Sequence, residues 1–246
     1  MTPTASWQER YADRFYHSQP GWKDGTTEFY DLCSGAIRSG SEILDVGAGP
    51  TNQVTRHLAT LGSVTGLDVD EAVHGNESCV ATRTYDGKQF PFEDNLFHGV
   101  VANYVLEHVE FPELFAGEVF RVLRPGGVFV FRCPNLWNYV SLIARLTPHW
   151  FHELVANKVR DLPDDHSAPY PTFHRLNTMR RCRKVLAAAG FEIVEMRSIE
   201  KQPSYGRFSR IAYLILMGYE RVVNSSQLFE PLRSNIFCVV RRPGGP

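Results

Sequence analysis

The sequence predicts an α/β fold with a doubly wound, mostly parallel sheet. Short apolar runs rich in Val, Ile, Leu and Phe recur along the chain, and segments with helical spacing lie between them. Strands that alternate with helices at this interval are typical of parallel sheets. The strand runs are apolar throughout their cores, as expected where helices cover both faces of a sheet. A turn containing two glycines directly follows the first of these runs.

The N-terminal part of the chain predicts helices and then the first strands. Within residues 1–40, aromatic side chains recur at roughly helical spacing and are interrupted by Gln-Pro-Gly, which indicates one or two short helices around a turn. The first two strands are expected at residues 42–46 and 64–69. A helix over residues 53–61 joins them, with Thr51 or Asn52 as its N-cap. The connection that follows the second strand has little helical character.

The remaining elements follow the same alternation with two interruptions. Strands are expected at residues 99–103, 128–131, 191–196 and 235–241, and helices at 113–123, 178–189 and 208–223. The stretches 134–177 and 200–232 are mostly irregular. We therefore expect a single domain, residues 1–246, that carries two insertions over its active site.

Composition excludes several classes of protein. Basic and acidic residues nearly balance, 26 against 27, which argues against nucleic acid as a partner. The longest apolar run, residues 211–217, is too short to cross a bilayer, and the polar N-terminal residues do not resemble a signal peptide. The five cysteines are scattered without metal-binding or disulfide spacing. These features predict a cytoplasmic protein without an integral membrane segment.

The turn after the first strand predicts a nucleoside site. Glycines there let a ligand approach the backbone, and Asp68, at the end of the second predicted strand, could accept hydrogen bonds from both hydroxyls of a ribose. Asp45 directly precedes the turn, where its charge would repel a phosphate and attract an ammonium group. The sequence GAGPTN also lacks the third glycine of GxGxxG. Both features disfavour NAD and favour a cationic nucleoside such as S-adenosylmethionine.

Several motifs in a fixed order extend this interpretation. The motifs ILDVGAGP, VTGLDVD, YDGKQFPFEDNLFHGVVANYVLEHV and VLRPGGVFVF lie within residues 43–131. Together they resemble the class I S-adenosylmethionine-dependent methyltransferases of the type-11 kind. The resemblance implies a Rossmann-like, seven-stranded sheet whose last strand is antiparallel. It also implies an enzyme that uses S-adenosyl-L-methionine and releases S-adenosyl-L-homocysteine.

The resemblance assigns cofactor contacts by position. Gly47, Ala48 and Gly49 would lie against the methionine part of the cofactor, with Asp45 near its ammonium group. Asp68 would hold the ribose. The adenine contacts would come from Val69, Asp86 and Gly87, and the cover over the methionine part from Asn103 and Tyr104.

Methyl transfer is an in-line displacement for which this family has no universal base, so catalytic candidates come from the residues around the acceptor. His108 follows the strand predicted at residues 99–103 and would lie near the methyl group; the alternative is a structural histidine that braces the loop. The segment 164–175 combines aromatic and polar residues without helical period, which favours a pocket wall over a solvated loop. The predicted catalytic residues are His108, His166 and His174, and the predicted acceptor contacts are Tyr16, Tyr170 and Arg175. No diagnostic spacing predicts a metal site.

Function hypotheses differ in the acceptor. The first is transfer to an O or N nucleophile of a small molecule, which could be bulky or hydrophobic. The second is a lipid or quinone methyltransferase at a membrane surface. It is suggested by the apolar helix near residues 211–223 with its flanking arginines and by the aromatic-rich stretch 136–151; burial of both in the core is the alternative. The third is a non-catalytic, S-adenosylmethionine-binding partner protein.

Overall fold

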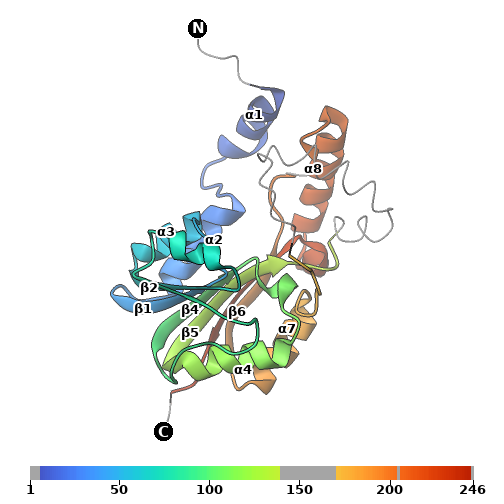
Figure 1. The fold of residues 1–246 in the computed structure, drawn as a ribbon. Helices are drawn as coiled ribbons and strands as arrows, with labels where there is room; N and C mark the ends of the chain where they lie inside the picture. Colours follow the sequence, from blue (N-terminus) through green and yellow to red (C-terminus); the bar gives the residue numbers. More distant parts are fainter. Residues whose placement is uncertain (1–5, 139–169, 204–205, 245–246) are drawn as a thin grey trace.

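The computed structural model describes residues 6–138, 170–203 and 206–244, and it forms a seven-stranded sheet between layers of helices (Figure 1). The strand order is β3-β2-β1-β4-β5-β7-β6, and β7 runs antiparallel to both of its neighbours. The predicted doubly wound sheet with an antiparallel last strand is therefore confirmed. The strands are β1 (Ser41–Val46), β2 (Gly62–Asp68), β3 (Ala81–Thr84), β4 (Phe97–Asn103), β5 (Leu123–Pro134), β6 (Glu192–Ile199) and β7 (Asn235–Arg241).

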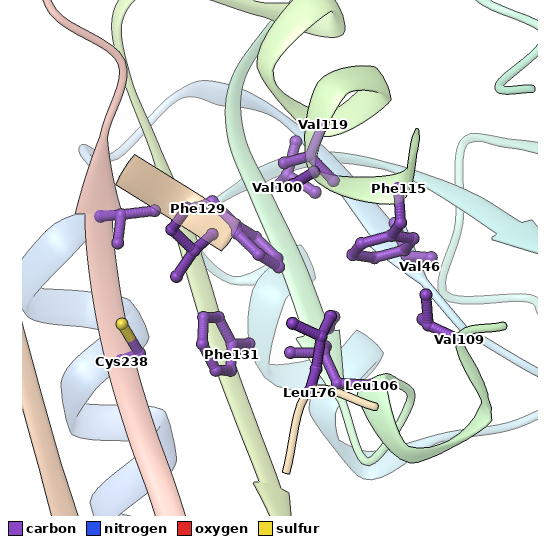
Figure 2. Close-up of a cluster of buried hydrophobic side chains, with 14 of the residues drawn as sticks. Val46, Val100, Leu106, Val109, Phe115, Val119, Phe129, Phe131, Leu176 and Cys238 are labelled. Carbon is purple, nitrogen blue, oxygen red and sulfur yellow. The ribbon is translucent and has the colours of Figure 1, made fainter. Parts of the chain in front are cut away.

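Helices cover the two faces of the sheet with separate hydrophobic clusters. On one face lie α2 (Gly25–Ala36) and α3 (Gln53–Ala59), and on the other lie α4 (Pro112–Val122) and α7 (Met179–Ala188). Figure 2 shows the second cluster, in which side chains from the central strands lie beneath Phe115 and Val119 of α4. Alternate residues of one strand serve the two clusters, because Phe129 packs toward α4 and Val130 toward α2 and α3. This two-sided burial explains the continuously apolar strand runs in the sequence.

Most of the predicted elements are present, with small shifts at their ends. The helix predicted at 53–61 is α3, and the side chain of its N-cap Asn52 accepts a hydrogen bond from the Val54 N–H at 2.8 Å. The weak connection after β2 holds the 3-10 helix η2 (Glu71–Gly75) and then β3, which the sequence did not predict. β3 escaped prediction because its sequence, ATRT, is short and mostly polar, and because it lies at the edge of the sheet.

The N-terminal residues form three helical segments where one or two were predicted. The π-helix η1 (Asp13–His17) continues α1 (Trp7–Ala12), and α2 follows after a turn. α1 and η1 pack on α8 (Arg210–Asn224), which is the helix predicted at 208–223 with its ends slightly shifted. Figure 1 shows α1 and α8 beside each other, beyond the edge of the sheet where β1, β4 and β5 end.

The division into one domain with two insertions stays a prediction. Of residues 134–177, the structure describes 134–138 and 170–177, and a 2.7 Å hydrogen bond from the Leu136 N–H to the Asn177 carbonyl joins these two stretches. Among the described helices, none has both the length and the apolar character that a bilayer-crossing segment needs.

Candidate cofactor and acceptor site

The turn after β1 has a backbone conformation that only glycine adopts without strain. Gly47 has φ +78° and Gly49 has φ +57°. A Cβ atom on Gly47 would lie 2.3 Å from a methyl carbon of Val105, so no side chain fits there. A Cβ atom on Gly49 would meet nothing within 4 Å. The turn is therefore packed closely on one side, beneath Gly47, and open beside Gly49.

Asp68 ends β2 and holds the glycine turn. Its Oδ2 accepts a hydrogen bond from the Gly49 N–H at 3.0 Å, and its Oδ1 accepts one from the Asp70 N–H at 3.1 Å. The residue is half-buried. Each carboxylate oxygen has a second lone pair, so Asp68 can bind two neighbouring hydroxyl groups, such as those of a ribose, while it supports the turn.

Asn76 fixes the same turn from the other side, and the sequence did not identify it. This buried side chain donates from Nδ2 to the carbonyls of Ala48 at 3.2 Å and Gly49 at 3.0 Å. A single asparagine in a weakly helical connection carries no signal in the sequence, because its partners become visible only when η2 packs against the turn.

Asp45 is fully buried beneath α3. The Thr55 hydroxyl donates to its Oδ2 at 2.6 Å, whereas its Oδ1 accepts no hydrogen bond within the described part of the chain. Burial raises the pKa of the Asp45 carboxyl to about 7; the Thr55 hydrogen bond lowers this pKa and the nearby Asp68 charge raises it. A buried carboxyl with one unsatisfied oxygen fits a nearby ammonium group, because such a cation would stabilise the ionised form.

The predicted adenine contacts lie together beyond β3. Gly87 has φ +78°, and a Cβ atom on it would lie 3.9 Å from the exposed Val69 side chain. Oδ1 of Asp86 accepts hydrogen bonds from the Lys88 N–H at 2.9 Å and the Gln89 N–H at 3.0 Å, and these backbone donors lower the pKa of Asp86. Asp86 is therefore ionised at neutral pH, with Oδ2 outside this turn.

Two of the hollows between described residues differ in their relation to the predicted adenine contacts. A hollow of about 460 Å³ opens beside Asp86 and is lined by residues 85–86 and 89–93. A hollow of about 520 Å³ lies between α2 and strands β5, β7 and β6, and it includes none of the predicted site residues. The first is the one that adjoins the adenine contacts.

The end of β4 is tied to α2 by Arg132 of β5, which the sequence did not identify. This buried guanidinium donates from Nε to Asn103 Oδ1 and from Nη1 to the carbonyl of Gly25 at 3.0 Å. It also lies between two aromatic rings, 4.7 Å from the centre of Tyr104 and 5.0 Å from that of Phe29. Burial lowers the pKa of Arg132.

Tyr104 has a left-handed backbone conformation, with φ +55°. Its hydroxyl donates to Asn235 Oδ1 at 3.0 Å, at the start of β7. Through Arg132 and Asn235, the strand ends of β4, β5 and β7 and the start of α2 form one connected group. Asn103 and Tyr104, the two predicted covers of the cofactor, are thereby held in place.

Residues 170–175 return across the site and bring predicted residues together. The Nδ1 of His108 lies 3.0 Å from the carbonyl oxygen of Pro171, so Nδ1 carries a proton and donates. The Tyr170 ring packs edge-on against His108 with centres 6.1 Å apart, and its hydroxyl donates to Asp70 Oδ2 at 2.8 Å. His108, Tyr170 and the end of β2 are therefore neighbours.

The other predicted catalytic and acceptor residues that the structure describes are His174, Arg175 and Tyr16, and each is bound to a neighbouring element. His174 has φ +53°, and its N–H donates to the Glu107 carbonyl at 3.0 Å, while Arg175 donates to the Glu110 carbonyl at 2.6 Å. Both attachments fasten this segment to the loop after β4. The hydroxyl of Tyr16, which is buried between η1 and α8, donates to Glu220 at 3.1 Å. His166 lies outside the described residues.

Known proteins resemble part of this sequence and most of its fold. Residues 44–131 match the family model described as a methyltransferase domain. The chain is 36% identical over 106 residues to the sterol 24-C-methyltransferase erg6 of Schizosaccharomyces pombe, a match that covers 38% of this chain and 28% of that protein. It is 32% identical over 118 residues to the ubiquinone/menaquinone biosynthesis C-methyltransferase UbiE of Roseobacter denitrificans, covering 43% of this chain and 45% of that protein. The chain thus matches less than half the length of each.

Solved structures extend the likeness to most of the chain. The cyclase SpnF superposes with a TM-score of 0.58 at 20% identity, covering 92% of this chain and 84% of that one. A putative methyltransferase in complex with the Haloferax volcanii Trm112 activator gives 0.59 at 16% identity, covering 90% and 89%. At identities of 20% and 16%, these superpositions show that the fold is shared.

The observed site agrees with the cofactor that this family uses. The open glycine turn, the half-buried Asp68 and the unsatisfied Oδ1 of Asp45 match a nucleoside that carries an ammonium group. Residues 44–131, from β1 to β5, thus match a methyltransferase domain model, and the seven-stranded order agrees with the class I, S-adenosylmethionine-dependent methyltransferase fold of the type-11 kind.

Proposed function

We propose that the chain transfers a methyl group from S-adenosylmethionine to an O or N nucleophile of a small-molecule acceptor. The observation that carries this proposal is the link from His108 through Tyr170 and Asp70 to Asp68 at the carboxyl edge of the sheet. The cofactor supplies an electrophilic methyl group on a sulfonium. The protein binds the nucleoside, aligns the acceptor and excludes water.

The cofactor half of the site is proposed to work through five groups of contacts. Asp68 accepts hydrogen bonds from the ribose hydroxyls, and Asp45 attracts the ammonium through its unsatisfied Oδ1. The backbone of residues 47–49 lies against the methionine part. Val69, Gly87 and Asp86 bind the adenine, the last through its exposed carboxylate. Asn103 and Tyr104, held by Arg132, close over the methionine part.

His108 is the proposed proton acceptor. Because its Nδ1 donates to the Pro171 carbonyl, the neutral ring has its lone pair on Nε2. Nε2 can then accept a proton from an acceptor hydroxyl or amine as the nucleophile attacks. The Tyr170 ring beside it fixes the plane of the imidazole. His174, Arg175 and Tyr16 are proposed to shape the acceptor side, and the role of His166 stays a prediction.

A second candidate is a lipid or quinone acceptor reached at a membrane surface. The specific observation that favours it is the outward side of α8, where apolar side chains are exposed. The names of two relatives, a sterol and a ubiquinone/menaquinone methyltransferase, give this candidate further support. The proposed location is the cytoplasm, in keeping with five cysteines that are all free thiols.

The first experiment is a calorimetric titration with S-adenosylmethionine, S-adenosylhomocysteine and NAD, followed by transfer of labelled methyl groups to phenols, amines, sugars, quinols and sterols. Because a cyclase shares this fold, binding alone does not establish transfer. Asp68→Ala is expected to weaken S-adenosylmethionine by roughly 1.5–3 kcal/mol. The matched control, Asp31→Ala, removes an exposed carboxylate of α2 that pairs with Lys23.

The outcomes separate the hypotheses. Binding of the first two ligands with labelled product supports the proposal. Binding without transfer to any acceptor would favour a non-catalytic partner protein. Binding of NAD alone, or equal loss of affinity in Asp68→Ala and Asp31→Ala, would contradict the assigned site.

A further inference from the structure

One side of α8 exposes a row of apolar side chains. Tyr213, Glu220 and Val223 face inward and are buried. The outward row, here called the α8 outer face, consists of Ile211, Leu214, Ile215 and Val222, which are 72%, 41%, 65% and 56% exposed. At 3.6 residues per turn these positions share one side of the helix. Phe208, just before the helix, is 56% exposed and extends the row.

The charges that border this row are all positive. Arg210 and Arg221 are exposed on α8, next to the outer face, and Arg207 is exposed in the preceding turn. The one carboxylate in α8, Glu220, points inward, where it accepts the Tyr16 hydroxyl and the Asn224 amide and lies 3.5 Å from Nε of Arg221. The exposed side of the helix therefore combines apolar and cationic groups and has no anionic group of its own.

This combination of exposed apolar and cationic side chains differs from an ordinary solvent-exposed helix face. Scattered exposed apolar residues are common on proteins, but a contiguous row along one helix usually marks an interaction site. A protein partner with an acidic groove and a lipid surface would both complement it in charge. The row is narrow, convex and bordered by long arginine side chains that can extend to a headgroup layer, which is the pattern of helices that lie in a membrane interface.

α8 is also joined to the edge of the sheet that holds the candidate site. Its last residue, Asn224, donates to the carbonyl of Glu200, directly after the end of β6. Tyr16 and Trp7, from the N-terminal helices, pack against its inward side. Figure 1 shows α8 extending away from this edge of the sheet. A surface that α8 contacts therefore lies on the acceptor side of the molecule.

We propose that the α8 outer face, with Phe208, Arg207 and Arg210, docks on an anionic lipid bilayer surface. The apolar row enters the boundary between headgroups and acyl chains, and the arginines contact lipid phosphates. The docking itself does not depend on methyl transfer. Its purpose, to bring an apolar acceptor to the site, rests on the proposed function.

The test is flotation of the full chain with phosphatidylcholine vesicles, made with and without phosphatidylglycerol. Ile211→Glu places a charge in the middle of the outer face and is expected to lower partitioning to the anionic vesicles about tenfold or more. Val80→Glu is the matched control, because Val80 is a β-branched residue that is also 72% exposed but lies before β3. Arg210→Gln is expected to lower binding to anionic vesicles about fivefold.

Each outcome decides the proposal. Binding to anionic vesicles that Ile211→Glu weakens and Val80→Glu preserves supports it. Absence of binding by the unaltered chain, equal loss in the two glutamate variants, or equal binding to neutral vesicles would overturn it. The proposal would also be overturned if the chain bound no vesicles but associated with itself, and if Ile211→Glu abolished that self-association. Calorimetry with S-adenosylmethionine on the same preparations shows that each variant is folded, and it tests the cofactor site independently of docking.

Discussion

The hydroxyl of Tyr170 donates a 2.8 Å hydrogen bond to Oδ2 of Asp70, joining two residues that lie 100 positions apart in the chain. Asp70 follows the proposed ribose ligand Asp68 by two residues and donates its own N–H to that carboxylate. The same tyrosine packs against His108, after β4. The contact therefore connects the cofactor side of the site to the proposed proton acceptor.

Tyr170→Phe tests this connection. The variant keeps the ring against His108 and removes the hydrogen bond, which contributes on the order of 1 kcal/mol. We expect a lower kcat and a raised KM for the acceptor, with S-adenosylmethionine affinity close to that of the unaltered chain. Steady-state kinetics and calorimetry measure the two effects. A large loss of cofactor affinity would instead place Tyr170 in the cofactor site.

Two His108 variants distinguish a general base from a residue that only supports the loop. His108→Ala removes both ring nitrogens, whereas His108→Asn keeps a side-chain N–H that can donate to the Pro171 carbonyl in place of Nδ1. If Nε2 accepts the proton, both variants lose turnover by about 10²-fold or more while cofactor affinity stays unchanged. Recovery of turnover in His108→Asn would show that the histidine only supports the loop.

Asp45 predicts a pH dependence of folding stability. Its pKa is about 7 in the folded chain and about 3.9 in an unfolded one, so the folded state binds more protons between these values. The contribution of Asp45 to stability is therefore greatest below pH ~4 and falls as the pH rises to about 7. Urea unfolding across this range should show the fall in the unaltered chain. A smaller fall is expected in Asp45→Asn, because the Glu200 carboxyl, whose pKa burial also raises to about 7, still contributes to it.

The same carboxyl predicts proton release on cofactor binding. An ammonium group near Oδ1 favours the ionised form, so binding of S-adenosylmethionine near pH 6.5 should expel a proton from Asp45. Calorimetry in buffers of different ionisation enthalpy measures this release. Comparison with Asp45→Asn removes the contribution of the cofactor's own amine. Equal proton release from the two proteins would show that Asp45 does not face the ammonium.

Arg132→Lys tests the tie beneath Tyr104. Lysine keeps the charge but cannot donate to Asn103 and α2 at once or stack between two rings. We expect a loss of about 1–3 kcal/mol in the free energy of unfolding and weaker cofactor binding. Arg124→Lys is the control, since Arg124 lies at the opposite end of β5 and contacts His98. Similar results for the two lysine variants would contradict a positioning role for Arg132.

The sequence predicted the cofactor half of the fold well because its signals are local. The apolar runs of β1, β4 and β5 are each buried on both faces, so their composition alone indicates strands. The turn after β1 is also marked in the sequence by its glycines, because the positive φ angles at Gly47 and Gly49 favour that residue type. β3 was missed because an edge strand with polar residues has neither a periodic nor an apolar signal.

Several residues of the candidate site could not be identified in this way. Asn76 meets the glycine turn from 27 and 28 residues away, and Arg132 meets Asn103 from 29 residues away. Each is a polar residue whose partners belong to another element. The sequence also named Tyr16 and Arg175 by residue type, whereas the structure shows their polar groups bound to Glu220 and to the Glu110 carbonyl.

By itself, the sequence determined the class of fold, the order of most elements and the cofactor family, because strand composition, turn chemistry and short motifs depend on neighbours in the chain. Only the tertiary structure decided which polar groups meet at the carboxyl edge of the sheet. Tyr170 and Asp70, Arg132 and Asn103, and Tyr16 and Glu220 come together through packing of distant elements. The physical reason is that a hydrogen bond depends on distance and direction in space, which spacing along the chain does not encode.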